Sequence, residues 1–288
     1  MKIGVIGNGM TATFMVGLLL KNGFKVAHYI DPYKVPHSWA SAGIVHPFNF
    51  KIATWKKFGY KSFFDFLQFL EVWDIKNFFH QKGLFYVCEN DGLWNDWSAL
   101  SERFPDFINI KKNGVFFPKS GWLEVKKAWD VLNNKFLKFS NYQRICDPPN
   151  LIKEKNIPIF VHAGGIDALK DHVHLPIYPK DGKIFKIQVE KPIISFVYWK
   201  QFFVTPTNNP LEYWIGPDQE SLQNFFDTFQ LEFKILKILS GVKPYSLLGR
   251  SFCIKQNQYI FLNGVGGRGL LEGIRIANEA IEIIKINE

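Results

Sequence analysis

The chain has 288 residues, of which 47% are hydrophobic and 21% are charged, so it can bury a full core and is not a disordered protein. It has no run of eighteen apolar residues, which argues against a transmembrane helix. A net charge of +9 would attract phosphate groups, but 30 of the 35 basic residues are lysines scattered along the chain. We interpret this charge as a general bias in composition and keep a nucleic-acid surface as the weaker alternative.

The cysteines and the first residues indicate in which cellular compartment the protein is expected. Cys88, Cys146 and Cys253 are isolated, odd in number and without the spacing of a metal site. No basic segment followed by an apolar one precedes the first predicted strand, so we expect no secretory signal. These features predict a cytoplasmic protein with neither a metal site nor a membrane contact.

The N-terminal residues predict a βαβ unit. Lys2–Ile6 is an apolar run typical of a buried strand, Thr13–Lys21 has a helical pattern, and Phe24–Ile30 predicts a second strand. Asn22-Gly23 would end the helix. This order of elements is that of a dinucleotide-binding unit.

The turn before that helix carries a recognisable fingerprint. The residues from Gly7 to Ala12 (GNGMTA) follow the pattern G-x-G-x-x-A. Gly7 permits the tight turn, Gly9 leaves room for a pyrophosphate, and Ala12 lets the helix lie close to the strand. Asp31, 24 residues after Gly7, would accept a hydrogen bond from a ribose hydroxyl, although the usual position of the acid is occupied by Ile30. The sequence therefore predicts a dinucleotide site at this turn.

The next segment resembles a known family. Ser38–Pro47 (SWASAGIVHP) is similar to the small-residue loop that follows the second strand in the D-amino-acid-oxidase and glycine-oxidase family of FAD-dependent oxidoreductases. Small residues there let backbone N–H groups reach the cofactor. Further segments resemble motifs of this family, in the family's order and over nearly the whole chain: Gly114–Pro118, Gly121–Leu123, Ile159–Gly165, Pro179–Ile187, Gly241–Pro244 and Leu262–Gly269.

The resemblance implies an α/β fold in which a Rossmann-type FAD-binding domain is interleaved with an antiparallel-sheet substrate domain. The FAD-binding domain would comprise residues 1–47, 121–171 and 241–288. The substrate domain would comprise residues 48–120 and 172–240.

Three stretches of the expected substrate domain have a clear pattern. Phe58–Phe79 is rich in aromatic residues at helical intervals, which predicts a helix that faces the core, with an aromatic cage for a ligand as the alternative. Ile184–Val189 and Ile194–Val204 alternate between apolar and polar residues, which predicts antiparallel strands. In the family such a sheet covers the flavin.

The resemblance also implies which residues hold FAD. They lie on the glycine turn, on the small-residue loop, after the third expected strand and on the last glycine-rich turn. These residues are Gly7, Gly9, Met10, Thr11, Ala12, Asp31, Ser41, Ala42, Gly43, Ala163, Gly164, Gly264, Gly266, Gly267, Arg268, Gly269 and Leu270. A helix expected from Leu271 to Ile284 would direct its positive N-terminal end at the flavin.

Three residues are candidates for contact with the substrate. Family enzymes transfer a hydride from the carbon beside an amine nitrogen to flavin, so the resemblance implies oxidation of an amino acid or an N-substituted glycine-like amine. Where the family has the arginine of G-x-R-P, this chain has Lys243, which keeps the positive charge and loses the two-pronged hydrogen bond to a carboxylate. Arg250 is a second cationic candidate, and His46 follows the small-residue loop closely enough to reach the flavin or the substrate.

Two other functions stay open. Gly121–Leu132 and Val265–Leu270 resemble the FAD domain of the bifunctional tRNA wobble-uridine enzyme, which predicts lysines clustered around the entrance of the flavin site. The segment Phe139–Pro158 is shorter than in the family, and this fits a non-catalytic flavin-binding protein, as do Ile30 and Lys243. A dehydrogenase that uses NAD alone leaves the later motifs unexplained. The expected partner is a small amine or amino acid, with tRNA as the weaker alternative.

Overall fold

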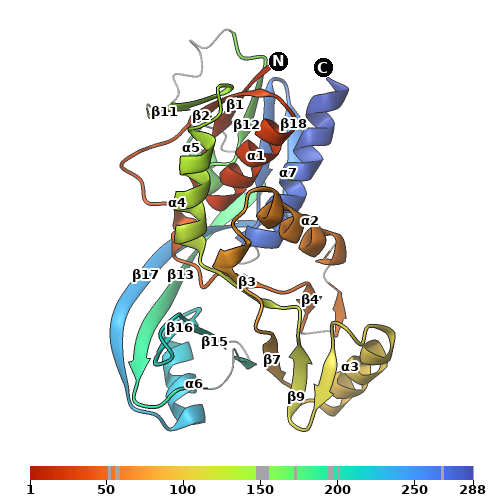
Figure 1. Cartoon of the computed structure of the whole chain (residues 1–288), viewed down its shortest axis with the longest axis vertical. Coiled ribbons are helices and arrows are strands. Elements are labelled where there is room, and N and C mark those ends of the chain that lie inside the picture. The colour runs from red at the N-terminus through yellow and green to blue at the C-terminus, as the bar shows by residue number, and fades with distance from the viewer. Residues whose placement is uncertain are drawn as a thin grey trace.

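Two large sheets organise the molecule. The computed structural model describes residues 1–50, 53–55, 59–146, 156–171, 174–193, 197–199, 202–266 and 269–287. A mostly parallel sheet lies at one end, together with both chain termini, and a mostly antiparallel sheet lies at the other (Figure 1).

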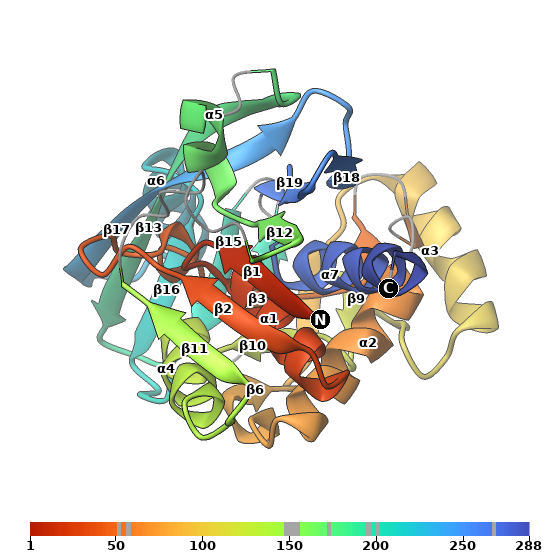
Figure 2. The same ribbon diagram turned by 90° about the horizontal axis from the view of Figure 1, so that it is seen from above.

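The first sheet has six strands, of which five run parallel and one, β18, pairs antiparallel at an edge. In spatial order they are β11 (Tyr142–Ile145), β2 (Lys25–Tyr29), β1 (Lys2–Ile6), β12 (Ile159–His162), β19 (Tyr259–Asn263) and β18 (Phe252–Gln256). Ile3 of the central strand β1 pairs with Val26 on one side and with Ile159 on the other. Figure 2 shows β11, β2, β1 and β12 side by side, so segments from distant parts of the sequence share this sheet.

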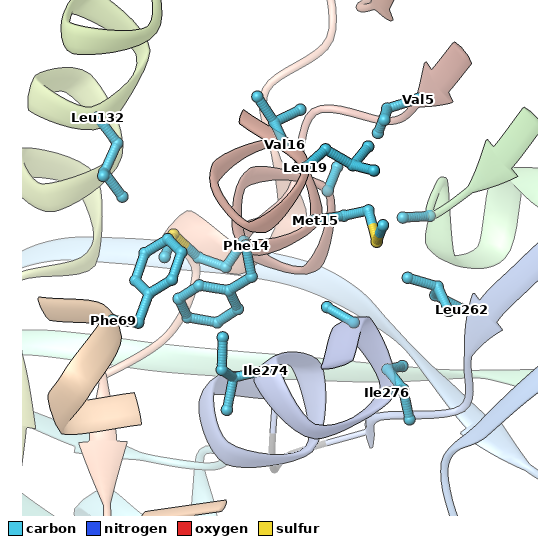
Figure 3. Packing of buried hydrophobic residues seen from close by; sticks show 14 of the residues in the cluster. Val5, Phe14, Met15, Val16, Leu19, Phe69, Leu132, Leu262, Ile274 and Ile276 are labelled. Carbon is cyan, nitrogen blue, oxygen red and sulfur yellow. The ribbon is translucent and has the colours of Figure 1, made fainter. Parts of the chain in front are cut away.

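Helix α1 (Met10–Lys21) lies between this sheet and two other helices, α2 (Gly59–Val72) and α7 (Gly269–Ile286). Phe14 points from α1 toward Phe69 of α2 and Ile274 of α7, whereas Met15 points toward Leu262 of β19 (Figure 3). The rings of Phe14 and Phe69 meet edge to face with centroids 5.0 Å apart. A fourth helix, α4 (Val125–Phe136), closes the same core with Leu132. Burial of this apolar face, more than helix propensity, therefore fixes α1.

Two glycines allow this close packing. A Cβ built on Gly17 would lie 2.7 Å from the ring of Phe69, and one built on Gly273 would lie 3.0 Å from Oγ1 of Thr11. Neither place has room for a side chain, so the helix that follows the glycine turn is held against α2 and α7.

The second sheet has eight strands. In spatial order they are β17 (Phe233–Ser246), β13 (Ile177–Val189), β16 (Glu212–Gly216), β15 (Phe202–Pro206), β14 (Val197–Trp199), β7 (Leu84–Val87), β9 (Gly114–Phe117) and β8 (Asn109–Lys111). All neighbours in this order run antiparallel except β14 and β7, which are parallel. Helix α6 (Glu220–Phe229) packs on one part of the sheet through Phe225, and α3 (Asp91–Arg103) packs on the other through Trp97.

The strands β13 and β17 form a long ribbon that joins the two ends of the molecule. They stay paired from Ile177 and Ser246 to Val189 and Phe233, with one irregularity after Lys186. In Figure 1 the ribbon curves along one side, from the parallel sheet to the far end of the molecule. The boundary expected at residue 241 falls inside β17, because the ribbon continues across it.

The remaining elements are short. They are η1 (His37–Trp39), β3 (Ile44–Val45), β4 (Phe48–Asn49), β5 (Thr54–Trp55), η2 (Lys76–Phe78), β6 (Phe79–His80), β10 (Gly121–Leu123), η3 (Gly165–Asp167) and α5 (Ala168–Asp171). β10 lies between β3 and β6 in a small antiparallel sheet.

The predicted fold class, a Rossmann-type sheet with an interleaved antiparallel sheet, is confirmed. Strand β1 has the predicted bounds, whereas α1 begins at Met10, three residues earlier than predicted, because extended Gly9 is its N-cap and the fingerprint itself forms the first turn. The aromatic run is a core-facing helix from Gly59 to Val72, where α2 buries Phe63 and Phe66, but Phe79 at its predicted end begins β6. Within the described residues, no helix is both long enough and apolar enough to cross a membrane.

Candidate functional site

A cavity of about 530 Å³ opens at the carboxyl ends of the parallel strands and extends to the β13–β17 ribbon. Such an edge of a parallel sheet is where α/β proteins bind their ligands. Most of the predicted site residues share its wall. Those that line the cavity are Gly7, Gly9, Met10, Thr11, Asp31, Ser41, Ala42, Ala163, Gly164, Lys243, Gly266, Gly269 and Leu270.

The two glycines of the fingerprint have different tasks. Gly7 has a φ of 132°, and a Cβ on it would lie 2.6 Å from the carbonyl oxygen of Ala163, so this turn packs tightly against the end of β12. A Cβ on Gly9 would meet only the hydroxyl of Ser38, at 3.8 Å. Open space therefore lies above Gly9, at the N-terminus of α1, where backbone N–H groups and the helix dipole favour an anion.

The edge of the cavity near β2 is polar. Ile30 and Asp31 both line it, and Asp31 uses Oδ1 to accept the N–H of Tyr33 at 3.0 Å. Lys34 forms an ion pair with Asp167 of η3, and both residues line the cavity. Asp31, although one residue late in the sequence, is thus at the cavity, and the pair of Lys34 and Asp167 adds polar groups there.

The small-residue loop forms another part of the wall. Ser41 and Ala42 line the cavity, and Ser41 Oγ accepts the N–H of Gly43 at 3.1 Å. Gly43 itself does not line it: its φ is 67°, and a Cβ there would lie 2.0 Å from the carbonyl oxygen of Leu123. Gly43 is required for close packing of β3 on β10.

The turn after β12 brings His162 into the site. His162 is 3% exposed and lines the cavity, and its Nδ1 accepts the N–H of Gly164 at 3.3 Å. The imidazole therefore fixes the turn in which Ala163 and Gly164 face the cavity.

The last glycine-rich turn meets the cavity only in part. Gly266, Gly269 and Leu270 line it, whereas Gly264 packs against the side chain of Ser246, where a Cβ would approach to 2.7 Å. Gly267 and Arg268, both predicted to bind the cofactor, lie outside the described residues. Helix α7 begins at Gly269, so its N-terminal end is at the cavity.

The end of the cavity toward the second sheet combines apolar side chains with an amine. Ile184 of β13 and Phe203 of β15 line it together with Lys243 of β17. A Cβ on Gly182, in the neighbouring strand, would lie 3.1 Å from both Cε and Nζ of Lys243, so the lysine side chain occupies the space that this glycine leaves. Burial and then the nearby ammonium of Lys180 lower the pKa of Lys243, and Asp218 partly offsets this.

Besides Gly43 and Gly264, three further predicted residues lie away from the cavity lining. His46 stacks on Phe50 with ring centroids 4.2 Å apart, in the aromatic cluster of the second sheet. Arg250 is exposed in the turn after β17. Ala12 is fully buried and supports the packing of α1, as the fingerprint predicts, without touching the cavity. Their roles in binding or catalysis stay predictions.

Sequence reasoning missed several lining residues. Lys34, His162, Asp167, Ile184 and Phe203 were not predicted as site residues, although His162 and Ile184 lie inside quoted motifs. The histidine in IFVHAGG, at the end of a buried strand, was the one signal that could have identified a site residue.

Polar atoms in the wall indicate a polar ligand. Among the described residues, Ser38 Oγ and Asn8 Oδ1 are buried and have no hydrogen-bond partner within the protein. Both residues line the cavity beside Gly9. Buried polar atoms normally have a partner, so a ligand with polar groups fits here. The open space at Gly9 and these atoms suit the pyrophosphate region of a dinucleotide.

Comparisons with known proteins agree with the fold. No protein-family model matches the sequence, and no curated protein does. Iminodiacetate oxidase from Chelativorans sp. BNC1 has a TM-score of 0.81 at 12% identity, over 98% of this chain and 95% of that chain. Glycine oxidase from Geobacillus kaustophilus has a TM-score of 0.78 at 14% identity, over 99% and 95%. L-proline dehydrogenase from P. horikoshii has a TM-score of 0.76 at 16% identity, over 100% and 94%. At these identities the likeness establishes the fold, and the predicted resemblance to glycine-oxidase-like proteins is confirmed at that level.

Proposed function

We propose that this chain binds FAD and oxidises the C–N bond of an amino acid or an N-substituted glycine-like amine. One observation carries the proposal: a single cavity joins the glycine turn of a dinucleotide-binding unit to a half-buried lysine on a second sheet. The names of the similar structures, two amine oxidases and a proline dehydrogenase, support the same class of reaction.

The residues near β1 and β12 suit the cofactor. Gly9 and the N-terminus of α1 would face the pyrophosphate, and Asp31 would face the ribose. The N-terminal end of α7, at Gly269, would lie against another part of the cofactor and favour negative charge there. FAD, when bound, supplies an acceptor for the hydride that leaves the carbon next to the amine nitrogen.

The residues near the ribbon suit the substrate. Lys243 offers an ammonium group to a carboxylate, and Ile184 and Phe203 offer apolar contacts to the carbon skeleton. These apolar walls limit the water around the ammonium, which strengthens its attraction for an anion. A lysine makes point contacts instead of the parallel pair of an arginine, so orientation of the substrate would depend more on the apolar walls.

A second candidate, modification of tRNA, is favoured by the lysines of the ribbon. Lys180 lies opposite Lys243 and Lys186 lies opposite Lys237, and the outer part of the ribbon also carries Lys234. Lys186 is ion-paired with Glu212, which reduces its effect. Cationic groups beside a cavity attract a polyanion, and such binding weakens steeply with salt.

The test is an absorbance spectrum of the purified protein, followed by anaerobic addition of substrates. We expect flavin bands near ~450 nm that bleach with one pool of amino acids or N-carboxymethyl amines. Bleaching only with tRNA that carries a carboxymethylaminomethyl uridine would favour the second candidate. Bands that bleach with none of these would indicate a non-catalytic flavoprotein, and a colourless protein that takes up no FAD would refute the proposal.

A further inference from the structure

Two side-chain N–H groups from residues outside the cavity lining form hydrogen bonds with the glycine turn. Nε2 of His28 lies 2.8 Å from the carbonyl oxygen of Gly7, and Nε1 of Trp129 donates to the carbonyl oxygen of Asn8 at 2.9 Å. His28 comes from β2 and Trp129 from α4, so two separate elements form hydrogen bonds with two successive peptide groups of the turn.

The hydrogen bonds of His28 fix which of its nitrogens carries the proton. A carbonyl can only accept, so Nε2 donates to Gly7, and Nδ1 is then the acceptor for the hydroxyl of Tyr142 at 2.9 Å. His28 is 1% exposed, and burial lowers its pKa to about 4, so the ring is neutral at physiological pH. The neutral ring keeps one donor and one acceptor, which is what these two partners need.

Holding the carbonyls also orients the N–H groups. In a planar trans peptide the C=O and the following N–H point in opposite directions. The carbonyl of Gly7 faces His28, so the N–H of Asn8 in the same peptide group points away from His28. The carbonyl of Asn8 faces Trp129, so the N–H of Gly9 points away from Trp129. Asn8 and Gly9 both line the cavity, whereas neither His28 nor Trp129 does.

We propose that His28 and Trp129 are positioning residues, which hold the glycine turn so that the N–H groups of Asn8 and Gly9 are directed at a diphosphate in the cavity. This inference rests on the proposed function only in requiring a dinucleotide ligand. Preorganised donors bind an anion more tightly than a turn that must first rearrange. Neither residue belongs to the G-x-G-x-x-A pattern, so the motif alone does not predict this support.

The test compares the affinity of flavin-free protein for three ligands: FAD, ADP, which has the diphosphate without the flavin, and adenosine, which has neither. We expect Trp129→Phe and His28→Leu each to bind FAD and ADP roughly three- to tenfold more weakly, since each loses one hydrogen bond that orients a donor. Adenosine, used as a competitor at millimolar concentration, should bind all forms alike. His28→Gln, which keeps an N–H donor, should recover part of the loss.

Trp94→Phe is the matched control, because Trp94 is a half-buried tryptophan on α3 that lies away from the cavity. Trp129 is also half-buried, so we expect its replacement by phenylalanine to leave a folded protein even if His28 variants lose stability. Unchanged ADP affinity in Trp129→Phe, or an equal loss for adenosine and ADP, would overturn the inference. Wild-type protein that binds neither FAD nor ADP would instead refute the proposed function, and the inference with it.

Discussion

Lys243 is a half-buried amine in the wall of the cavity. Its side chain lies beside Gly182, at the end of the cavity that Ile184 and Phe203 also line. Burial and Lys180 both disfavour its charged form, which is why its pKa is lowered. A carboxylate in the cavity would reverse this, because an opposite charge nearby favours the ammonium. The unfavourable environment of the free lysine is therefore a reason for it to bind an anion.

Replacement of Lys243 tests this role. Lys243→Met should raise KM for a carboxylate-bearing substrate by roughly ten- to a hundredfold, the value of a hydrogen bond to a charged group, with FAD affinity unchanged. Lys237→Met, at an exposed position of the same strand, should leave KM unchanged. Equal KM values in the two variants would contradict the role of Lys243.

The same residue predicts a pH dependence. Only the ammonium attracts a carboxylate, so KM should rise as pH increases through the pKa of Lys243. Because this pKa lies below the ordinary lysine value, the rise should begin at lower pH than for an exposed lysine. Lys243→Arg keeps its charge at every accessible pH, and its KM profile should be flat over the same range. KM measured from pH 7 to 10 checks this, and the same dependence of KM on pH in the wild type and in Lys243→Arg would contradict the prediction.

Among the site residues, the sequence predicts those whose position depends on local spacing along the chain. Gly7, Gly9 and Met10 reach the cavity because a strand, a turn and a helix fix their positions. His46 was predicted from its place just after the small-residue loop, and its ring stacks on Phe50, away from the cavity lining. His28 offered no signal, because its partner in β11 is more than a hundred residues away.

Among the elements, α1 is the one that joins the packed core to the glycine turn. It is buried between the parallel sheet, α2 and α7, and its N-terminus carries the glycine turn. Phe14 is fully buried and contacts the rings of both Phe66 and Phe69. Loss of this side chain would leave a cavity between the helices, because its neighbours come from separate elements, the two rings from α2 and Ile274 from α7, and cannot fully collapse.

Phe14→Ala should lower the free energy of unfolding by about 3–5 kcal/mol, the usual effect of deleting a buried phenylalanine. Phe64→Ala, on the exposed side of α2 where the side chain is 43% exposed, should cost clearly less. Urea unfolding followed by circular dichroism measures both. Similar losses for the two variants would show that α1 is not the packed centre described above.

The pattern of apolar residues predicts the elements better than it predicts their pairing. β1, α1 and α2 follow from periodicity, whereas the parallel contact between β14 and β7 has no local signal. β13 extends from Ile177 to Val189, longer than the alternating stretch that predicted it, because the partner strand β17 supplies hydrogen bonds along its whole length.

At the scale of the whole molecule, the cavity couples the two sheets. Its wall includes the turn after β1, the turn after β12 and the β13–β17 ribbon. A ligand that reaches from one sheet to the other stabilises both, because any ligand that binds only the folded state stabilises the parts it contacts.

Hydrogen exchange can test whether one ligand spans this distance. FAD should protect amides both around Gly9 and around Lys243, whereas ADP should protect only the first region. Protection by FAD confined to the glycine turn would contradict a ligand that extends to the ribbon.

The overall architecture could be expected from the order of the motifs, since they follow one known fold from end to end. The shape of the cavity could not, because it depends on side chains such as Phe203 and Ile184 that approach from the second sheet. Such contacts arise from packing between distant segments and leave no periodic trace in the sequence.

The order of strands in the parallel sheet also governs when the protein can mature during its synthesis. The glycine turn emerges from the ribosome well before Lys243, Gly269 and Leu270, which complete the same cavity. β19, which pairs with β12, is also made long after the glycine turn. The first βαβ unit therefore keeps apolar surface uncovered until β19 and α7 have been made, since these later elements cover it. Ligand capture by the complete cavity is thus a step that follows the synthesis of α7.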